Sequence, residues 1–115
     1  MGAPIVFFDI AGPSTSDLSA FYGTVFGWGI APDGSFSVSV VNPIPGTLRQ
    51  DPAEKVVYVG VPDVTATLNL IVENGGAVVA PRFEVRGVVI LGLFTDPAGN
   101  RLGLVEMDGE RAKIP

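Results

Sequence analysis

The sequence contains no cysteine and no histidine, and these two absences exclude much of the usual metal and nucleophile chemistry. Without cysteine the chain has no disulfide, no thiol nucleophile and no thiolate ligand. Without histidine it lacks the commonest transition-metal ligand and the commonest general base. No serine therefore has an imidazole to activate it, and the two lysines, Lys55 and Lys113, fall in a predicted linker and tail.

Charge is also scarce, since Asp, Glu, Lys and Arg make up 17% of the 115 residues and the formal net charge is −5. An acidic chain lacks the basic face that phosphates require, so we expect no nucleic-acid partner. No apolar run is long enough to span a membrane, and no signal-peptide pattern precedes the first predicted strand. We therefore expect no membrane partner and a cytoplasmic location. The apolar fraction of 47% suffices for the core of one domain, residues 1–115.

The first half of the chain is organised around a strand followed by a capped helix. Ile5–Ile10 is short, β-branched and aromatic, which favours a strand. Apolar residues then recur at helical spacing and predict a helix near Ser16–Phe26, with Ser14 or Ser16 as its N-cap. Gly27 stands where a left-handed C-cap is needed.

A weaker copy of this pattern begins near Val56, and aligning Pro62 with Pro13 superimposes the two halves. The second helix is predicted near Val64–Asn74, with Thr65 or Thr67 as its cap. Alternation of apolar side chains and the intervening turn signals place the remaining strands. These strands are predicted at Trp28–Ala31, Ser35–Val41, Thr47–Gln50, Val56–Val61, Ala77–Ala80, Val88–Phe94 and Arg101–Glu106.

The repeat divides the domain into two modules of the same α+β class. Module one is predicted at about residues 4–50, a linker at 51–55, module two at about 56–107, and a frayed tail at 108–115. Arg82–Arg86 reads as a charged connection or a strand edge. Each module has the order strand–helix–strand–strand–strand, so its helix should cover one face of a four-stranded sheet. The other face needs a partner, and the second module is the obvious candidate.

Several of these stretches resemble the vicinal oxygen chelate superfamily, which includes glyoxalase I, bleomycin-resistance proteins and extradiol dioxygenases. The matching segments are FFDI…LSAFYGTVFGW in the first half and YVGVPDV…NGGAVV…FTDPAGNRLGLVE in the second. The resemblance implies two βαβββ modules that pair curved mixed sheets around a cavity. It also implies a homodimer, as do open sheets whose edges a partner usually covers.

The resemblance further implies a divalent metal held by four His or Glu side chains, two from each module. Three of the matching positions hold Phe7, Val56 and Gly103, whose side chains offer no lone pair. The fourth falls near Thr47–Gln50, where Gln50 is the only conceivable substitute. We therefore expect no metal, no other cofactor and no catalytic residue.

Asp9 is the most informative side chain, because strand alternation places it on the cavity side beside Phe7. It is either the polar anchor of a ligand or the partner of Arg49, Arg82 or Arg101, with a solvated sheet edge as the remaining alternative. Trp28 and Tyr58 could stack on a planar ligand, and Trp28 could equally be a core residue. The predicted ligand-binding residues are Phe7, Asp9, Trp28, Val56, Tyr58, Gly103 and Val105.

Two further groups of polar side chains are expected to face solvent. Ser35, Ser37 and Ser39 alternate along one strand, and their alternative role is to form a hydroxyl-lined cavity wall. Glu106 is predicted to be a solvated strand end, because alternation places it opposite Gly103.

The leading hypothesis is a metal-free protein that binds or sequesters a small molecule, with a cationic or aromatic ligand. One alternative is a metal-dependent lyase, isomerase or dioxygenase of the same superfamily, with a relocated site made of oxygen ligands. A second alternative is a non-catalytic dimerisation or accessory domain. The sequence does not identify the ligand.

Overall fold

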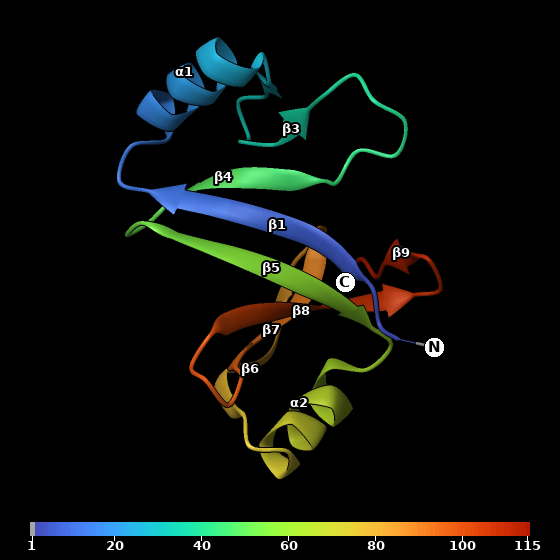
Figure 1. Cartoon of the computed structure of the whole chain (residues 1–115). Helices are drawn as coiled ribbons and strands as arrows, with labels where there is room; N and C mark the ends of the chain where they lie inside the picture. The colour runs from blue at the N-terminus through green and yellow to red at the C-terminus, as the bar shows by residue number, and fades with distance from the viewer. Residues whose placement is uncertain (1) are drawn as a thin grey trace. The chain divides into compact units, whose positions relative to one another are not determined.

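The computed structural model describes residues 2–115 and divides into two compact units (Figure 1). Unit 2 is Phe7–Val56, and unit 1 contains residues 2–6 together with Val57–Pro115. Two helices and a mixed sheet confirm the predicted α+β class. No helix among residues 2–115 is long and apolar enough to cross a membrane.

Unit 2 has the predicted order of elements, with the first strand parallel to the last. Its elements are β1 (Ile5–Gly12, which begins in unit 1), α1 (Thr15–Phe26), β2 (Gly29–Ile30), β3 (Phe36–Ser37) and β4 (Gly46–Gln50). Strand β1 pairs in parallel with β4, and β2 pairs antiparallel with β3. An isolated antiparallel bridge between Ser35 and Thr47 links the β2–β3 hairpin to β4.

Both ends of α1 follow from local sequence. The side chain of Ser14, one of the two predicted caps, accepts a hydrogen bond from the backbone N–H of Asp17 at 3.2 Å. Gly27 ends the helix in the left-handed conformation, with φ of 70°. The apolar stripe of α1 is only partly covered, because Phe21 and Val25 remain 56% and 54% exposed.

The predicted strand Ser35–Val41 is wrong over most of its length, since β3 contains only Phe36 and Ser37. The segment that follows carries Pro43 and Pro45, which have no N–H to donate to a neighbouring strand. The chain therefore leaves the hairpin as a loop, and Val41 is 89% exposed.

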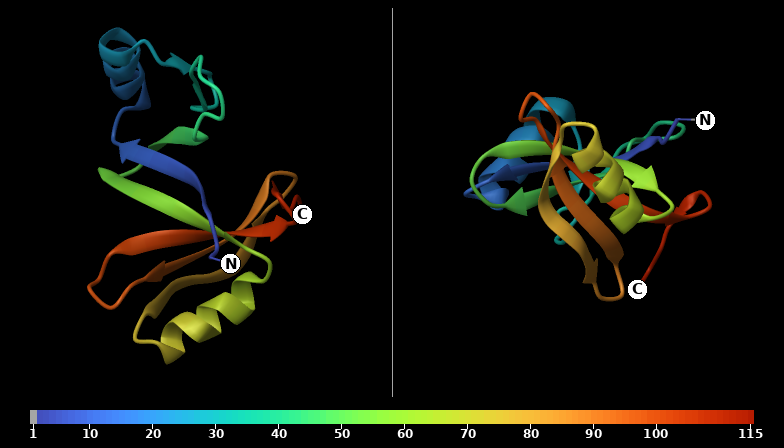
Figure 2. Two further views of the ribbon diagram at one scale, coloured as in Figure 1. Left: turned by 45° about the vertical axis from the view of Figure 1, so that its right-hand side comes forward. Right: turned by 90° about the horizontal axis from the view of Figure 1, so that it is seen from below.

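Unit 1 repeats the arrangement with longer strands. Its elements are β5 (Glu54–Val61, which begins in unit 2), α2 (Val64–Glu73), β6 (Ala77–Val85), β7 (Val89–Thr95), β8 (Arg101–Asp108) and β9 (Arg111–Ala112). Strand β5 is parallel to β8, and β7 lies antiparallel between β8 and β6, which gives the order β5-β8-β7-β6. Figure 2 shows α2 alongside this sheet. The core between α2 and this sheet consists of Val61, Val64, Leu68 and Leu104.

Three predictions for unit 1 are corrected by the structure. The cap of α2 is Asp63, whose side chain accepts from the N–H of Ala66 at 2.9 Å, rather than either predicted threonine. Strand β6 runs past its predicted end at Ala80 to Val85, so of the two alternatives for Arg82–Arg86 the structure shows a strand. The predicted frayed tail contains β9, which pairs with β8. Gly109, with φ of 64°, takes the first position of the two-residue turn between the paired residues Asp108 and Arg111, where a hairpin turn favours glycine.

Glu106 is also corrected, because it is 4% exposed rather than solvated. Its carboxylate accepts hydrogen bonds from Nε and Nη2 of Arg82, both at 3.0 Å, and from the backbone N–H of Val64 at 3.1 Å. The ammonium of Lys113 lies 3.7 Å away. The hydrogen bonds from Arg82, with further help from Val64 and Lys113, overcome burial and lower the pKa of Glu106 to about 2. This carboxylate joins the start of α2, strand β6 and the C-terminal segment.

We predict that Glu106 makes the stability of the fold depend on pH in acid. Because its pKa is lower in the folded state, its contribution is complete above the unperturbed value of 4.5 and is lost as the pH falls toward 2. Glu106→Gln should lower the free energy of unfolding by about 3 kcal/mol near neutral pH. Urea titrations should show this difference shrinking at about pH 3.

Glu84→Gln is the matched control, because Glu84 contacts the same Arg82 at 3.7 Å but its side chain is 50% exposed. It should cost less than about 1 kcal/mol. Equal losses in the two variants would contradict the assignment of Glu106 as the buried anchor.

Candidate functional site

Asp9 lies on the face of unit 2 that points away from α1. Its neighbour Phe8 packs against Phe36 on the α1 side, with ring centroids 5.4 Å apart. Successive side chains of a strand alternate between faces, so Asp9 and the half-buried Phe7 share the opposite face. Asp9 is 3% exposed, which makes it the most deeply buried charged side chain of unit 2.

Arg49 on β4 is the cation that neutralises this buried acid. Its Nη2 lies 3.3 Å from Oδ1 of Asp9 and 3.0 Å from Oε1 of Glu54, and its Nη1 donates to Asp51. Burial alone would lower the pKa of Arg49, but the hydrogen bonds to Asp9 and Asp51 raise it overall. Of the alternatives for Asp9, the structure therefore shows the ion pair with Arg49.

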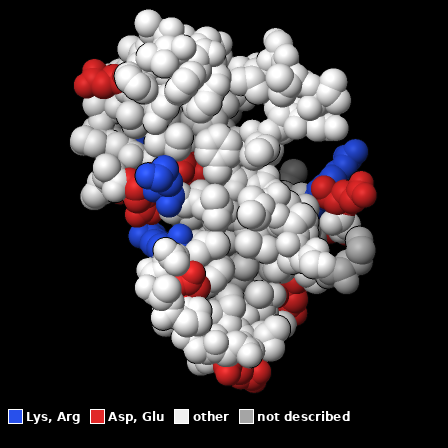
Figure 3. Space-filling view, viewed as in Figure 1, with Lys and Arg blue, Asp and Glu red and all other residues white. Residues whose placement is uncertain are grey.

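The cluster formed by Arg49, Asp9, Asp51 and Glu54 has two properties that bear on binding. Three carboxylates surround one guanidinium, so the cluster is net acidic when all four groups are ionised. The Nε atom of Arg49 is buried and has no hydrogen-bond partner among the described residues. Figure 3 shows acidic and basic side chains together near the turn between β4 and β5, on a face that is otherwise mostly uncharged.

Trp28 is placed on the other side of unit 2, in an aromatic stack with α1. Its ring is stacked on Tyr22, with centroids 5.1 Å apart, and contacts Phe36 at 5.0 Å. Phe36 in turn contacts Phe8. Trp28 is thus half-buried in an aromatic cluster on the opposite side of β1 from Asp9.

In unit 1, Tyr58, Gly103 and Val105 lie on the sheet face opposite α2. Tyr58 is the direct cross-strand partner of Gly103, while Leu104 between Gly103 and Val105 belongs to the core under α2. Val56 precedes Tyr58 by two residues on β5 and is 2% exposed. A Cβ atom at Gly103 would overlap the ring of Tyr58, so the ring occupies the space that any side chain at that position would need.

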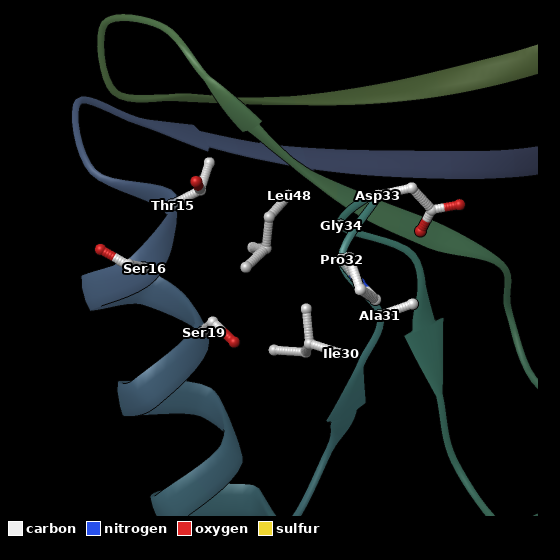
Figure 4. A pocket seen from close by; sticks show the side chains of 9 residues that line it. All are labelled: Thr15, Ser16, Ser19, Ile30, Ala31, Pro32, Asp33, Gly34 and Leu48. Atoms are coloured by element: carbon white, nitrogen blue, oxygen red, sulfur yellow. The ribbon is translucent and has the colours of Figure 1, made fainter.

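A pocket of about 350 Å³ lies between the start of α1 and the β2–β3 hairpin of unit 2 (Figure 4). Ile30 and Leu48 point into it, as does the hydroxyl of Ser19, whereas the carboxylate of Asp33 points away. That carboxylate accepts from the side chain and backbone of Ser35, which lowers the pKa of Asp33. The lining residues are Thr15, Ser16, Ser19, Ile30, Ala31, Pro32, Asp33, Gly34 and Leu48.

The sequence analysis does not predict this pocket, because it interprets the serines near the start of α1 only as helix caps. The available signal is a helix whose hydroxyl residues, Thr15, Ser16 and Ser19, fall within one turn of each other. Ser37 and Ser39 are exposed, as predicted, whereas Ser35 is half-buried and donates to the carboxylate of Asp33.

Comparisons with known proteins agree on one superfamily. CFP32 of Mycobacterium tuberculosis and of Mycobacterium bovis, named provisionally as a glyoxylase, is 32% identical over 108 residues. The alignment covers 78% of this chain and 41% of those relatives. A solved methylmalonyl-CoA epimerase, in complex with methylmalonyl-CoA and NH4+, matches 96% of this chain and 99% of its own with a TM-score of 0.64. The chain belongs to the vicinal oxygen chelate superfamily.

A further solved member of the glyoxalase/bleomycin resistance protein/dioxygenase superfamily, from Vibrio splendidus 12B01, has a TM-score of 0.64 over 92% of this chain and 100% of its own. Identities to these two structures are 14% and 10%, so they establish the fold alone. No protein-family model matches the sequence.

The metal of the vicinal oxygen chelate enzymes does not fit the residues present here. Phe7 and Val56 offer no ligand atom, and the ring of Tyr58 fills the space beside Gly103. In the stretch expected to supply the fourth ligand, Arg49 brings a cation onto the face that carries Asp9. Among residues 2–115, no group of three or more carboxylates is arranged to hold a metal ion.

We predict that Gly103→Ala destabilises the fold through its contact with Tyr58. The added methyl group forces the ring to move, which should cost about 1–3 kcal/mol of unfolding free energy. In a double-mutant cycle, the same substitution in a Tyr58→Leu background should cost less, because the ring is gone. Additive effects of the two substitutions in urea unfolding would contradict this packing.

We also predict that Asp9→Asn lowers stability, because it removes a buried charge that balances Arg49. The expected loss is about 1–3 kcal/mol in urea unfolding. Asp51→Asn is the control, since Asp51 contacts the same guanidinium with a side chain that is 49% exposed, and it should cost less than about 1 kcal/mol. Unchanged stability in Asp9→Asn would argue against a structural ion pair.

Proposed function

We propose that this chain is a metal-free small-molecule binding protein of the vicinal oxygen chelate superfamily. The observation that carries the proposal is the packing of Tyr58 onto Gly103, which puts an aromatic ring where the superfamily enzymes place a metal-ligating carboxylate. Phe7 and Val56 support the same conclusion, because neither can replace a missing ligand.

The chemistry of the ligand follows from what these surfaces offer. Tyr58 and Val105 lie on the unit 1 sheet face opposite α2, where they are 8% and 4% exposed, and the exposed edge of the tyrosine ring offers an aromatic molecule a contact. The cluster around Arg49 in unit 2 has more carboxylates than cations, which favours a positively charged ligand over an anion. We therefore propose a cationic or aromatic small molecule as the ligand class, with each property resting on the unit that offers it. Binding alone requires no general base, in keeping with a chain that has no histidine and no cysteine.

The names glyoxylase and methylmalonyl-CoA epimerase belong to the mycobacterial relatives and the structural neighbour, and we do not transfer them to this chain. This chain spans 41% of the relatives' length and is 14% identical to the epimerase. An enzymatic role would need metal ligands that the matching positions do not supply, so we place binding ahead of catalysis.

Metal and ligand binding can be tested on the same purified protein. After dialysis against zinc, nickel, manganese or iron, elemental analysis should find less than about 0.1 metal ion per chain. Calorimetry with the planar aromatic cation proflavine should detect binding, and Tyr58→Leu should weaken it about two- to tenfold, because aromatic stacking is worth about 0.5–1.5 kcal/mol.

Tyr22→Leu is the matched control, since Tyr22 stacks on Trp28 beside α1 and should not affect proflavine affinity. Close to one metal ion per chain, or no binding of proflavine by the folded protein, would overturn the proposal. An equal loss of affinity in the two tyrosine variants would also count against it, because it would indicate a general effect of removing an aromatic ring.

A further inference from the structure

The pocket between the start of α1 and the β2–β3 hairpin lies on the opposite side of β4 from the cluster around Arg49. Leu48 of β4 points into the pocket (Figure 4), whereas the next residue, Arg49, reaches Asp9 on the other face. All the lining residues belong to unit 2, and none of them carries the proposed function. The pocket is therefore a separate candidate for a binding site.

The hairpin side of this pocket is held in place by hydrogen bonds within unit 2. The backbone N–H of Gly34 donates to the carbonyl of Ala31 at 2.8 Å, and the N–H of Leu48 donates to the carbonyl of Gly34 at 2.9 Å. Gly34 has φ of 90°, and a Cβ atom there would lie 2.6 Å from the carbonyl oxygen of Leu48, so only glycine permits this close approach. The pocket is thus preformed, and little of the chain has to be ordered when a ligand enters.

The pocket has the size of a small-molecule site. Its volume of about 350 Å³ lies within the range of about 300–1,000 Å³ that is typical of ligand pockets. A water molecule takes about 30 Å³ in the liquid, so a molecule of about ten non-hydrogen atoms fits this space. Leu48 is buried, whereas Ser16 and Pro32 are exposed and leave the pocket open to solvent.

The lining offers apolar side chains and a hydroxyl group but no available charge. Ile30 and Leu48 point into the pocket, and so does the hydroxyl of Ser19, which has no hydrogen-bond partner among residues 2–115. No lysine or arginine lines the pocket, and the carboxylate of Asp33 points away and accepts from Ser35. A charged ligand would lose hydration without gaining a partner there. A neutral hydroxyl group, by contrast, can donate to or accept from the hydroxyl of Ser19.

We propose that this pocket binds a small neutral molecule with an apolar body and a hydroxyl group. The apolar body lies against Ile30 and Leu48, and the hydroxyl group forms a hydrogen bond with Ser19. This site is additional to the ligand surfaces of the proposed function and does not depend on them.

Three probes on nearly the same frame test the neutral class of ligand. We choose para-hydroxybenzyl alcohol, which is neutral, para-hydroxybenzylamine, which is cationic, and para-hydroxybenzoate, which is anionic. Titration of the alcohol into the isotope-labelled full chain should shift the backbone amide signals of Ser19, Ile30 and Gly34, with half-saturation at about 1 mM or below. The amine and the carboxylate should bind at least about fivefold more weakly, because neither charge finds a partner in the lining.

Substitutions of Ser19 test the location of the site. Ser19→Leu fills the pocket and removes the hydroxyl, so it should weaken binding of the alcohol more than about tenfold. Ser19→Ala removes only the hydroxyl and should weaken it about two- to tenfold, the expected effect of one hydrogen bond. Thr24→Leu is the matched control, since it adds the same side chain at an exposed position of α1 outside the lining and should leave the affinity unchanged. Dispersed amide signals show that each variant is folded.

Cross-measurements separate this proposal from the proposed function. Ser19→Leu should keep the wild-type affinity for proflavine, and Tyr58→Leu should keep the wild-type affinity for para-hydroxybenzyl alcohol. Failure of either proposal then leaves the other one standing.

Four results would overturn the assignment of this pocket. The first is the absence of shifts at the lining residues of the folded chain, at about ten times the expected half-saturation concentration. Tighter binding of the carboxylate would indicate an anion at the N–H groups of the first turn of α1, and tighter binding of the amine would indicate a reoriented Asp33. Unchanged affinity in Ser19→Leu, or shifts centred on Tyr58, would place the alcohol elsewhere on the chain.

Discussion

The parallel pairing of the first strand of each unit with its fourth strand is the constraint on which the rest of the structure depends. Two parallel strands cannot be joined by a tight turn, so the chain between them must cross over, and here it does so through a helix and two further strands. In unit 2 this pairing joins β1 to β4, and in unit 1 it joins β5 to β8. It fixes which face of the first strand lies under the helix and which face is left for other side chains.

The buried charges follow from that arrangement. In unit 2, Asp9 lies on the face away from α1 and is balanced by Arg49 from the paired strand β4. In unit 1, Glu106 lies on the face under α2 and is balanced by Arg82 from β6. The two acids use opposite faces of their sheets, and each depends on an arginine distant in sequence. The units thus share the order of elements and the parallel pairing of first and fourth strands, but neither one continuous four-stranded sheet nor one polar network.

Local patterns predicted the helices, the caps at Ser14 and Gly27, and most strands, because these features depend on neighbouring residues. The sequence-based prediction failed where the structure of a segment depends on a partner that is distant in sequence. Arg82–Val85 extends β6 because β7 and Glu106 hold it, and neither contact is visible in the segment itself. Alternation gave the faces of Asp9, Tyr58 and Gly103, but it could not choose Arg49 among three arginines as the partner of Asp9. Trp28 was ambiguous because a large aromatic side chain suits both a core and a ligand surface.

The contact between Tyr58 and Gly103 has a consequence for how this protein can change over time. A carboxylate introduced at position 103 by itself would meet an aromatic ring rather than open space. A carboxylate at this position therefore requires coordinated replacement of at least these two residues, and the single replacement carries a packing defect. The two positions are thus coupled in evolution, since the effect of a substitution at one depends on the residue at the other.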